Sequence, residues 1–443
     1  MSNNLMRKQA IKVGKMVELP ESWAVKQIKE TMDLESGVWG KEDESGYPVL
    51  RSTNFTESGY IDFEEVTYRD IPDRKIDDKK LKKGDVLLEI SGGGPKQPVG
   101  RVVFFDEKEN KDYLFGNFVK RLRLKDKLSE ENDPFYIFRF LERYYDIGQT
   151  ETLQHQTTGI RNLDYRAYMS LPLPLPPFPE QKKIASILLS VDKSIEKTDE
   201  VIEETKELKK GLMKELLTKG IGHSEFKEVT ALGQNYTIPK DWSLKELNEV
   251  LKVIRNGSSK KQNKQGQGLP VSRIETISDG TINYDKVGYV DLEPEDLKKH
   301  ELEKGDVLFS HINSIAHIGK VAQYKADKKL YHGMNLLKLR FDNKIVTDQF
   351  MLHRLKSINA KHFYERYAKQ AVNQASLNQK DVGLYTFPLP SLEEQKKIAS
   401  IISLVESKIK KEEEYKAKLE RLKKGLMQKL LTGEIRVNTE MEV

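Results

Sequence analysis

The sequence predicts an α+β protein with an internal pseudo-two-fold duplication. Two α/β globular domains are expected, separated by two long helices that form an antiparallel coiled coil. Two observations predict this class. The stretch EQKKIASI occurs twice, at Glu180–Ile187 and Glu394–Ile401. Each copy opens a segment of about 38 residues with apolar positions at helical spacing, and each follows about 150 residues of mixed strand and helix pattern.

The duplication extends well beyond eight residues. Pro174–Val191 aligns with Pro388–Val405, and Leu208–Thr218 aligns with Leu422–Thr432, at the same offset. About half of the aligned positions are identical without a gap, which indicates an internal repeat rather than chance. Upstream the similarity between the two copies is weaker: KKGDVLLEIS resembles EKGDVLFSHI, and LPESWAVKQIKE resembles IPKDWSLKELNE. The chain therefore alternates variable and well-matched regions.

Composition limits the classes of protein that remain. A chain of 443 residues is too long for one core, and the absence of cysteine excludes disulfide scaffolds and thiolate metal sites. No apolar run reaches about 18 residues, and the N-terminus lacks the apolar stretch of a signal peptide, so a cytoplasmic protein is expected. The net charge is +6, and its excess lies in residues 221–443, where a polyanion is expected to bind more strongly.

Each matched region predicts one long helix. A proline-rich stretch ends the preceding domain, and Pro179 and Glu180 suit a first helical turn. Apolar residues then recur at steps of three and four, which is typical of the narrow stripe of a coiled coil. Packing of each helix on its own globular neighbour alone is the alternative. The predicted contacts of the helix–helix or subunit interface are Ile184, Leu188, Val191, Leu208, Leu212, Leu216, Ile398, Ile402, Val405, Leu422, Leu426 and Leu430.

The variable regions predict globular domains with polar loops. Short strands are expected at GDVLLEIS, GRVVFFD and KRLRL, and a helix at DPFYIFRFLERYYDI. Amide- and hydroxyl-rich segments, GQTETLQHQTTGIRNL and KQAVNQASLNQK, precede the prolines. Such side chains pair with the edges of DNA bases, although an ordinary solvated loop has the same composition.

No catalytic or metal site is predicted. SGGGPKQPVG lacks the lysine and hydroxyl pattern of a phosphate-binding loop, and NDPFY lacks the second proline of an adenine methyltransferase motif. His311, His317 and His332 have no carboxylate or cysteine neighbours in the sequence that would suggest a metal site.

The duplicated helix motif, PLP…EQKKIA at its start and LKKGLM…LLT at its end, resembles the specificity (S) subunit of Type I restriction–modification enzymes. The resemblance covers nearly the whole chain. It implies a non-catalytic subunit in which two target recognition domains each read half of a bipartite site in double-stranded DNA, and the helices set the spacing. It departs in one place, because no third copy of the helix motif precedes the first domain.

The implied domains follow from this resemblance. They are an N-terminal extension (1–17), target recognition domain 1 (18–177), spacer helix 1 (178–220), target recognition domain 2 (221–391), spacer helix 2 (392–434) and a C-terminal tail (435–443).

The resemblance also implies partners. Two methyltransferase (M) subunits and, through them, two restriction (R) subunits are expected. No cofactor is expected in this chain, because S-adenosylmethionine, ATP and Mg²⁺ belong to those partners. A stand-alone DNA-binding or anti-restriction protein of the same architecture is the main alternative. An overlooked enzyme and a purely protein-binding adaptor are the others.

Residues that contact DNA are expected in the amide-rich and glycine-anchored loops. The candidates are Arg51, Lys96, Gln97, Arg101, Gln154, Gln156, Arg161, Lys260, Lys261, Arg273, Asn313, Lys320, Gln370 and Gln374.

Overall fold

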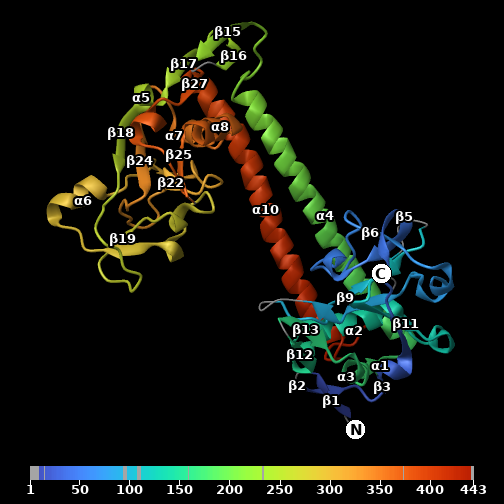
Figure 1. The fold of residues 1–443 in the computed structure, drawn as a ribbon. Helices are drawn as coiled ribbons and strands as arrows, with labels where there is room; N and C mark the ends of the chain where they lie inside the picture. Colours follow the sequence, from blue (N-terminus) through green and yellow to red (C-terminus); the bar gives the residue numbers. More distant parts are fainter. Residues whose placement is uncertain are drawn as a thin grey trace. The chain divides into compact units, whose positions relative to one another are not determined.

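The computed structural model describes residues 9–13, 15–92, 97–106, 111–157, 159–231, 234–372 and 374–440. The chain divides into two compact units (Figure 1). Unit 1 consists of Met1–Asp199 and Tyr415–Val443, and unit 2 consists of Glu200–Glu414. Each unit therefore combines one globular domain with a part of each long helix.

The two long helices are α4 (Phe178–Leu216) and α10 (Leu392–Leu430), each 39 residues long. In unit 1, Lys416 pairs with Asp199 (2.6 Å) and Lys423 with Asp192 (2.9 Å). Residue numbers rise along one helix as they fall along the other, so the helices run antiparallel, and the predicted helix pair is confirmed. Packing on the neighbouring domain also occurs, because Ile184 and Leu188 share a hydrophobic core with that domain's sheet.

In unit 1 a four-stranded antiparallel sheet carries the main core, in the order β4-β11-β7-β9. Helix α2 (Pro134–Asp146), a helix that the sequence predicts, packs against this sheet. Asp133 caps α2, because its carboxylate accepts a hydrogen bond from the backbone of Tyr136. The sheet consists of β4 (Met32–Ser36), β11 (Val119–Leu124), β7 (Val86–Glu89) and β9 (Val102–Phe104).

Smaller sheets surround this core, in the orders β10-β5-β6, β12-β13-β8, β14-β3 and β1-β2. The remaining elements of unit 1 are β1 (Gln9–Val13), β2 (Lys15–Leu19), β3 (Ala24–Gln27), α1 (Ile28–Thr31), β5 (Lys41–Leu50), β6 (Thr67–Asp70), β8 (Ser91–Gly92), β10 (Leu114–Phe115), β12 (Gln154–Thr157), β13 (Ile160–Leu163), α3 (Tyr165–Met169) and β14 (Pro172–Leu175).

Unit 2 repeats this plan, with the main sheet in the order β18-β24-β21-β23 and smaller sheets β22-β26-β25, β17-β27, β15-β16 and β19-β20. Its strands are β15 (Phe226–Ala231), β16 (Gln234–Pro239), β17 (Ser243–Glu246), β18 (Leu251–Asn256), β19 (Leu269–Val271), β20 (Gly288–Val290), β21 (Val307–Ser310), β22 (Ile312–Asn313), β23 (Val321–Gln323), β24 (Leu336–Phe341), β25 (Lys369–Ala371), β26 (Gln374–Ser376) and β27 (Thr386–Leu389). Its helices are α5 (Leu247–Val250), α6 (Pro294–His300), α7 (Asp348–Leu355), α8 (Ile358–Tyr367) and α9 (Gln379–Gly383).

The repeated EQKK stretch joins each long helix to its domain. Gln181 is 1% exposed; its side-chain oxygen accepts the backbone N–H of Asp133 at 2.9 Å, and its amide donates to the carbonyl of Pro176 at 2.8 Å. Gln395 makes the same two bonds in unit 2, with Thr347 (2.9 Å) and a proline carbonyl (3.0 Å). The stretch occurs twice because each unit needs the same buried joint.

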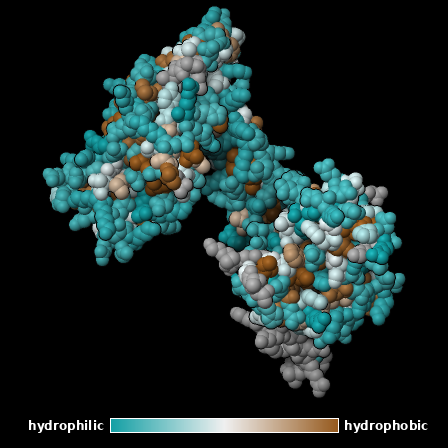
Figure 2. All heavy atoms as spheres, in the orientation of Figure 1, coloured by the Kyte–Doolittle hydropathy of each residue, from teal (hydrophilic) through white to brown (hydrophobic). Residues whose placement is uncertain are grey.

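The surface is polar. The face drawn in Figure 2 is largely hydrophilic in both units, with scattered hydrophobic spots. Among the described residues, no helix combines the length and the apolar character needed to cross a bilayer.

Candidate nucleic-acid interface

In unit 1 the amide-rich segment forms a β-hairpin, β12–β13, which joins β8 in a three-stranded antiparallel sheet. Gln156 is exposed on β12, directly opposite Arg161 of β13. Gln154 plays a different part, because its amide donates to the carbonyl of Val99 at 2.8 Å and ties the hairpin to the preceding loop. The hairpin is therefore anchored at its base and presents Gln156 to solvent.

Arg101 supports a neighbouring loop. Its guanidinium makes two hydrogen bonds to Glu89 (2.9 and 3.0 Å) and also donates to the carbonyls of Ser52 and Phe55. These bonds hold the segment that follows Arg51, whose Nε is buried without a hydrogen-bond partner. Arg101 thus holds this loop in place, and its role in DNA binding stays a prediction.

The loop between β8 and β9 holds two further candidates. Gln97 is exposed. Lys96 lies outside the described residues.

In unit 2 the corresponding hairpin is β25–β26, which joins β22. Gln370 and Gln374 are both exposed on it, and Val372 at its turn is 93% exposed. Asn313 on β22 is held in place, because its amide donates to Ser310 and its oxygen accepts the backbone N–H of Ser314.

The basic candidates of unit 2 differ in the contacts that their side chains make within the unit. Lys260 pairs with Glu293 (3.1 Å), and Arg273 pairs with Glu275 (3.1 Å). Lys320 donates to the carbonyl of Ser278 (2.9 Å). Lys261 is exposed. The role of each in DNA binding stays a prediction.

A pocket of about 450 Å³ lies beside β22 and β26 and is lined mostly by polar side chains, including Asn256, His311, Asn378 and Gln379. Burial lowers the pKa of His311 to about 4, so its ring is neutral at pH 7.

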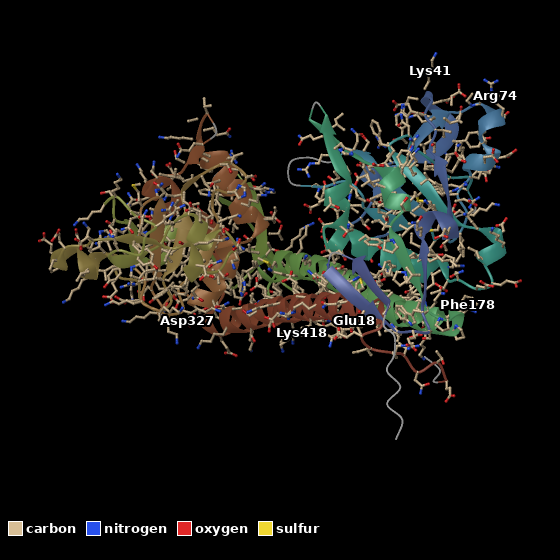
Figure 3. The ribbon with its side chains drawn as sticks, turned by 90° about the horizontal axis from the view of Figure 1, so that it is seen from below. Glu18, Lys41, Arg74, Phe178, Asp327 and Lys418 are labelled. Carbon is tan, nitrogen blue, oxygen red and sulfur yellow. The ribbon has the colours of Figure 1, made fainter. Side chains whose placement is uncertain are left out.

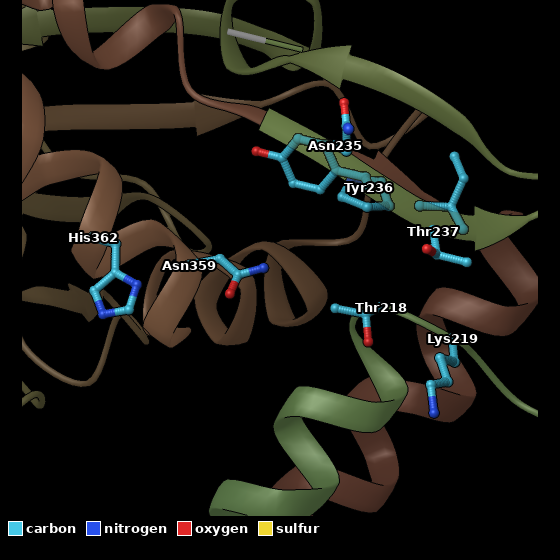
Figure 4. A pocket seen from close by; sticks show the side chains of 9 residues that line it. Thr218, Lys219, Asn235, Tyr236, Thr237, Asn359 and His362 are labelled. Carbon is cyan, nitrogen blue, oxygen red and sulfur yellow. The ribbon is translucent and has the colours of Figure 1, made fainter. Parts of the chain in front are cut away.

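A second pocket in unit 2, of about 530 Å³, is drawn in Figure 4. Thr218 and Lys219 after α4, Asn235–Thr237 on β16, and Asn359 and His362 on α8 surround it. No candidate DNA-binding residue lines it.

The predicted interface residues of the long helices fall into three groups. Ile184, Leu188, Leu216, Ile398, Ile402 and Leu430 are buried in the cores of the units. Val191, Leu212, Val405 and Leu426 are partly buried. Leu208 and Leu422 are 56% and 51% exposed. The last two occupy equivalent positions of the repeat.

Sequence reasoning missed a buried ion network in unit 1. Asp192 of α4 contacts Arg139 of α2 and Lys423 of α10, and Glu142 contacts both cations. Arg139 is completely buried. Unit 2 holds a related pair, Lys209 with Glu406 at 2.7 Å, and these residues align with Lys423 and Asp192 in the repeat. The acid and the base recur at equivalent repeat positions, and this was the signal available in the sequence.

His223 lies between Glu394 (2.8 Å) and Asp241 (3.4 Å) in unit 2. It presents Nε2 to one carboxylate and Nδ1 to the other. Nε2 of His223 is hydrogen-bonded to the Glu394 carboxylate.

Each unit thus presents an amide-bearing hairpin and is joined to a long helix through a buried glutamine. The family model described as the Type I restriction modification DNA specificity domain matches residues 20–207 and 239–421. The chain belongs to this family and is the DNA specificity subunit of a Type I restriction–modification system.

Several known proteins are similar. The type I restriction enzyme MjaVIII specificity subunit of Methanocaldococcus jannaschii is 27% identical and aligns over 95% of both chains. A second chain from that organism, predicted to be the MjaX specificity subunit, is 47% identical over 44% of this chain and 46% of its own length. The crystal structure of the S subunit from M. genitalium shares the fold, with a TM-score of 0.55, 18% identity and 97% coverage of both chains.

Proposed function

We propose that each unit reads one half of a bipartite site in double-stranded DNA. The observation that carries this proposal is the equivalent placement of two exposed amides, Gln156 on β12 and Gln370 on β25. Glutamine pairs with the major-groove edge of adenine. The residues around these amides differ between the units, as expected if each unit recognises a different short sequence.

Single substitutions test this proposal in a cell that carries the intact system. Gln156→Ala is expected to relax one base position in one half-site, and Gln370→Ala one position in the other. The loss of discrimination is expected to be about 1–3 kcal/mol. Genomic mapping of methylated sites measures both, and Lys182→Ala, on α4, is the control. A change in both halves from either substitution would show that the units are not independent readers.

The helices are proposed to set the spacing between half-sites and to dock two M subunits, through which two R subunits join. Internal pseudo-symmetry supports two identical partners, since it offers the same surface twice. The exposed Leu208 and Leu422 are the proposed matching contacts. S-adenosylmethionine, ATP and Mg²⁺ would bind to those partners, in the cytoplasm.

Co-purification separates this arrangement from a stand-alone DNA-binding or anti-restriction protein. The full chain is expected to purify with two M subunits, and Leu208→Glu or Leu422→Glu alone to reduce the ratio to one. Absence of any M subunit from the wild-type chain would favour the stand-alone alternative.

A further inference from the structure

Val372 is the most exposed large hydrophobic side chain among the described residues. It is 93% exposed, and the next, Leu404, is 73% exposed. Polar and charged side chains project from both units, with the exposed Asp327 and Lys418 as labelled examples (Figure 3). Single exposed apolar side chains are common on protein surfaces, so the place of Val372 in the fold decides what its exposure means.

Neither the turn nor the core accounts for a valine at this position. Ala371 of β25 pairs with Gln374 of β26, so a two-residue turn closes the hairpin and Val372 is its first residue. Turns of this length favour glycine, asparagine and aspartate, and a β-branched side chain gives them no advantage. At 93% exposure Val372 also packs against almost nothing within the chain. Its side chain is therefore available for a contact outside the chain.

The hairpin extends beyond the strand that supports it. Strand β22 pairs with β26 only at Ser376 and Ala375, so Ala371 and Gln374 pair with each other alone. Ala375 is 1% exposed and belongs to the core of unit 2, which anchors the base of the hairpin. We define the hairpin tip as the exposed residues Gln370, Ala371, Val372 and Gln374. The tip is thus a two-stranded ribbon on a fixed base, with apolar groups between two amides.

Unit 1 has an apolar side chain in the same part of its hairpin. Thr157 and Ile160 form the last pair before the turn of β12–β13, and Ile160 is 46% exposed. In both units the next pair contains the exposed glutamine, which is Gln156 in unit 1 and Gln370 in unit 2. An exposed amide beside an exposed branched apolar group therefore occurs twice, at the same place in the repeat.

We propose that Val372 packs against the 5-methyl group of a thymine in the half-site that unit 2 reads. The inference rests on the proposed function of unit 2. The major groove of DNA admits a two-stranded ribbon, and the thymine methyl is the apolar group that base pairs present there. An apolar side chain at a tip that enters this groove has that methyl as its partner. The contact removes both groups from water and favours thymine over cytosine at that position.

Removal of the thymine methyl from the DNA is the first test. The assembled complex binds duplexes that carry its mapped methylation site, with one thymine at a time replaced by deoxyuridine. This replacement removes the methyl group and leaves every hydrogen-bonding group of the base in place. The half-site of unit 2 is the one that Gln370→Ala alters. At one position of this half-site, deoxyuridine is expected to weaken binding about fourfold, which corresponds to one buried methyl group.

Variants of Val372 connect that loss to its side chain. Val372→Ser is expected to bind the thymine duplex about fourfold less tightly than wild type, with no further loss on the deoxyuridine duplex. Val372→Ile keeps the apolar contact and is expected to keep the preference for thymine. If deoxyuridine weakened Val372→Ser as much as wild type at every position, the proposal would be overturned, because another group would then contact the methyl.

Two other residues of the chain supply matched controls. Ile160→Ser is expected to leave the response to deoxyuridine in the half-site of unit 2 unchanged, since Ile160 belongs to the hairpin of unit 1. Ile358→Ser removes a side chain that is 49% exposed on α8 of unit 2, and it is expected to leave the affinity unchanged. A loss of affinity in Ile358→Ser equal to that in Val372→Ser would contradict a specific role for Val372.

The remaining outcomes separate this inference from the proposed function. If no deoxyuridine in the half-site of unit 2 weakens wild-type binding, the methyl contact fails while DNA reading stands. If Val372→Ser reduces the number of bound M subunits without DNA, Val372 makes a protein contact and the proposal fails. If the wild-type complex binds no specific duplex, both the proposed function and this inference fail.

Discussion

At the scale of single residues, the ion network around Asp192 decides how firmly unit 1 is held together. Arg139 is fully buried and Lys423 is 14% exposed, and both depend on Asp192 and Glu142 for their counter-charge. Tyr60 also donates to Asp192 at 3.0 Å. Burial lowers the pKa of Lys423, a sign that its charge is costly there.

Asp192→Ala is therefore expected to destabilise unit 1 by about 3–5 kcal/mol, because it leaves buried positive charge uncompensated. Asp199→Ala removes the partner of Lys416 from the same helix, but Asp199 is 45% exposed, so the expected cost is under about 1 kcal/mol. Denaturant unfolding of the two variants measures both values. Equal costs would mean that the buried network contributes no more than a surface ion pair.

At the scale of elements, the buried glutamines explain how a long helix and a short one begin together. Gln181 satisfies a backbone N–H at the start of α2 while bonding to a carbonyl just before α4. One side chain thus fixes the relative position of two helix starts in unit 1, and Gln395 does the same for α7 and α10 in unit 2.

Gln181→Ala is expected to cost about 1–3 kcal/mol, since the buried N–H of Asp133 loses its acceptor. The loss should appear as faster hydrogen exchange in α2 and leave α7 unchanged. Gln395→Ala should give the converse. Lys182→Ala is the control for α4, and exchange that changed equally in both helices would contradict a local role.

The length of the helices gives a second prediction at this scale. Four residues inserted near Glu200 extend α4 by about 6 Å and keep the apolar stripe nearly in phase, because four is close to 3.6. The gap between half-sites is expected to grow by about one or two base pairs at 3.4 Å each, while the sequences of both half-sites stay unchanged. A two-residue insertion turns the stripe by about 200° and should damage packing. An unaltered gap in a stable four-residue variant would show that α4 does not set the spacing.

At the scale of the whole molecule, histidine is unevenly distributed. Seven of the eight histidines belong to unit 2, and unit 1 has only the exposed His155. Burial lowers the pKa of His353 to about 4 and that of His332 to about 3. Both rings are neutral in the folded state at pH 7.

Acid should therefore weaken unit 2 before unit 1. A group whose pKa is depressed by folding contributes stability above its unfolded pKa of about 6.5, and that stability falls as the pH drops toward the folded value. At pH 5 the loss is about 2 kcal/mol for His353 alone. Hydrogen exchange in each unit at pH 7.5 and at pH 5, corrected for the intrinsic exchange rates, measures this loss of stability. His353→Gln should reduce the pH dependence of the stability of unit 2. An equal loss of stability in both units would contradict this prediction.

The repeat made the fold predictable, because local patterns carry most of it. EQKKIASI and the apolar stripes predicted both long helices, and Asp133 before Pro134 predicted the start of α2. The partners of charged groups were not predictable in this way. The bonds of Arg101 to Glu89 and to carbonyls about 50 residues away could not be predicted from the sequence, and its contact with DNA stays a prediction. Such pairings depend on which strands become neighbours, and the sequence pattern does not state this.

The segments of the chain that form each unit also determine which unit can fold first during synthesis. Unit 2 is one continuous segment, whereas unit 1 needs Tyr415 and the residues after it. Leu430 and Leu431 lie in the core of unit 1, and Arg436 makes two hydrogen bonds to Glu180. A ribosome therefore completes the second unit of the chain before the first can close. Until then the first unit exposes the apolar surface that α10 later covers, and a chaperone or a partner subunit would find it open.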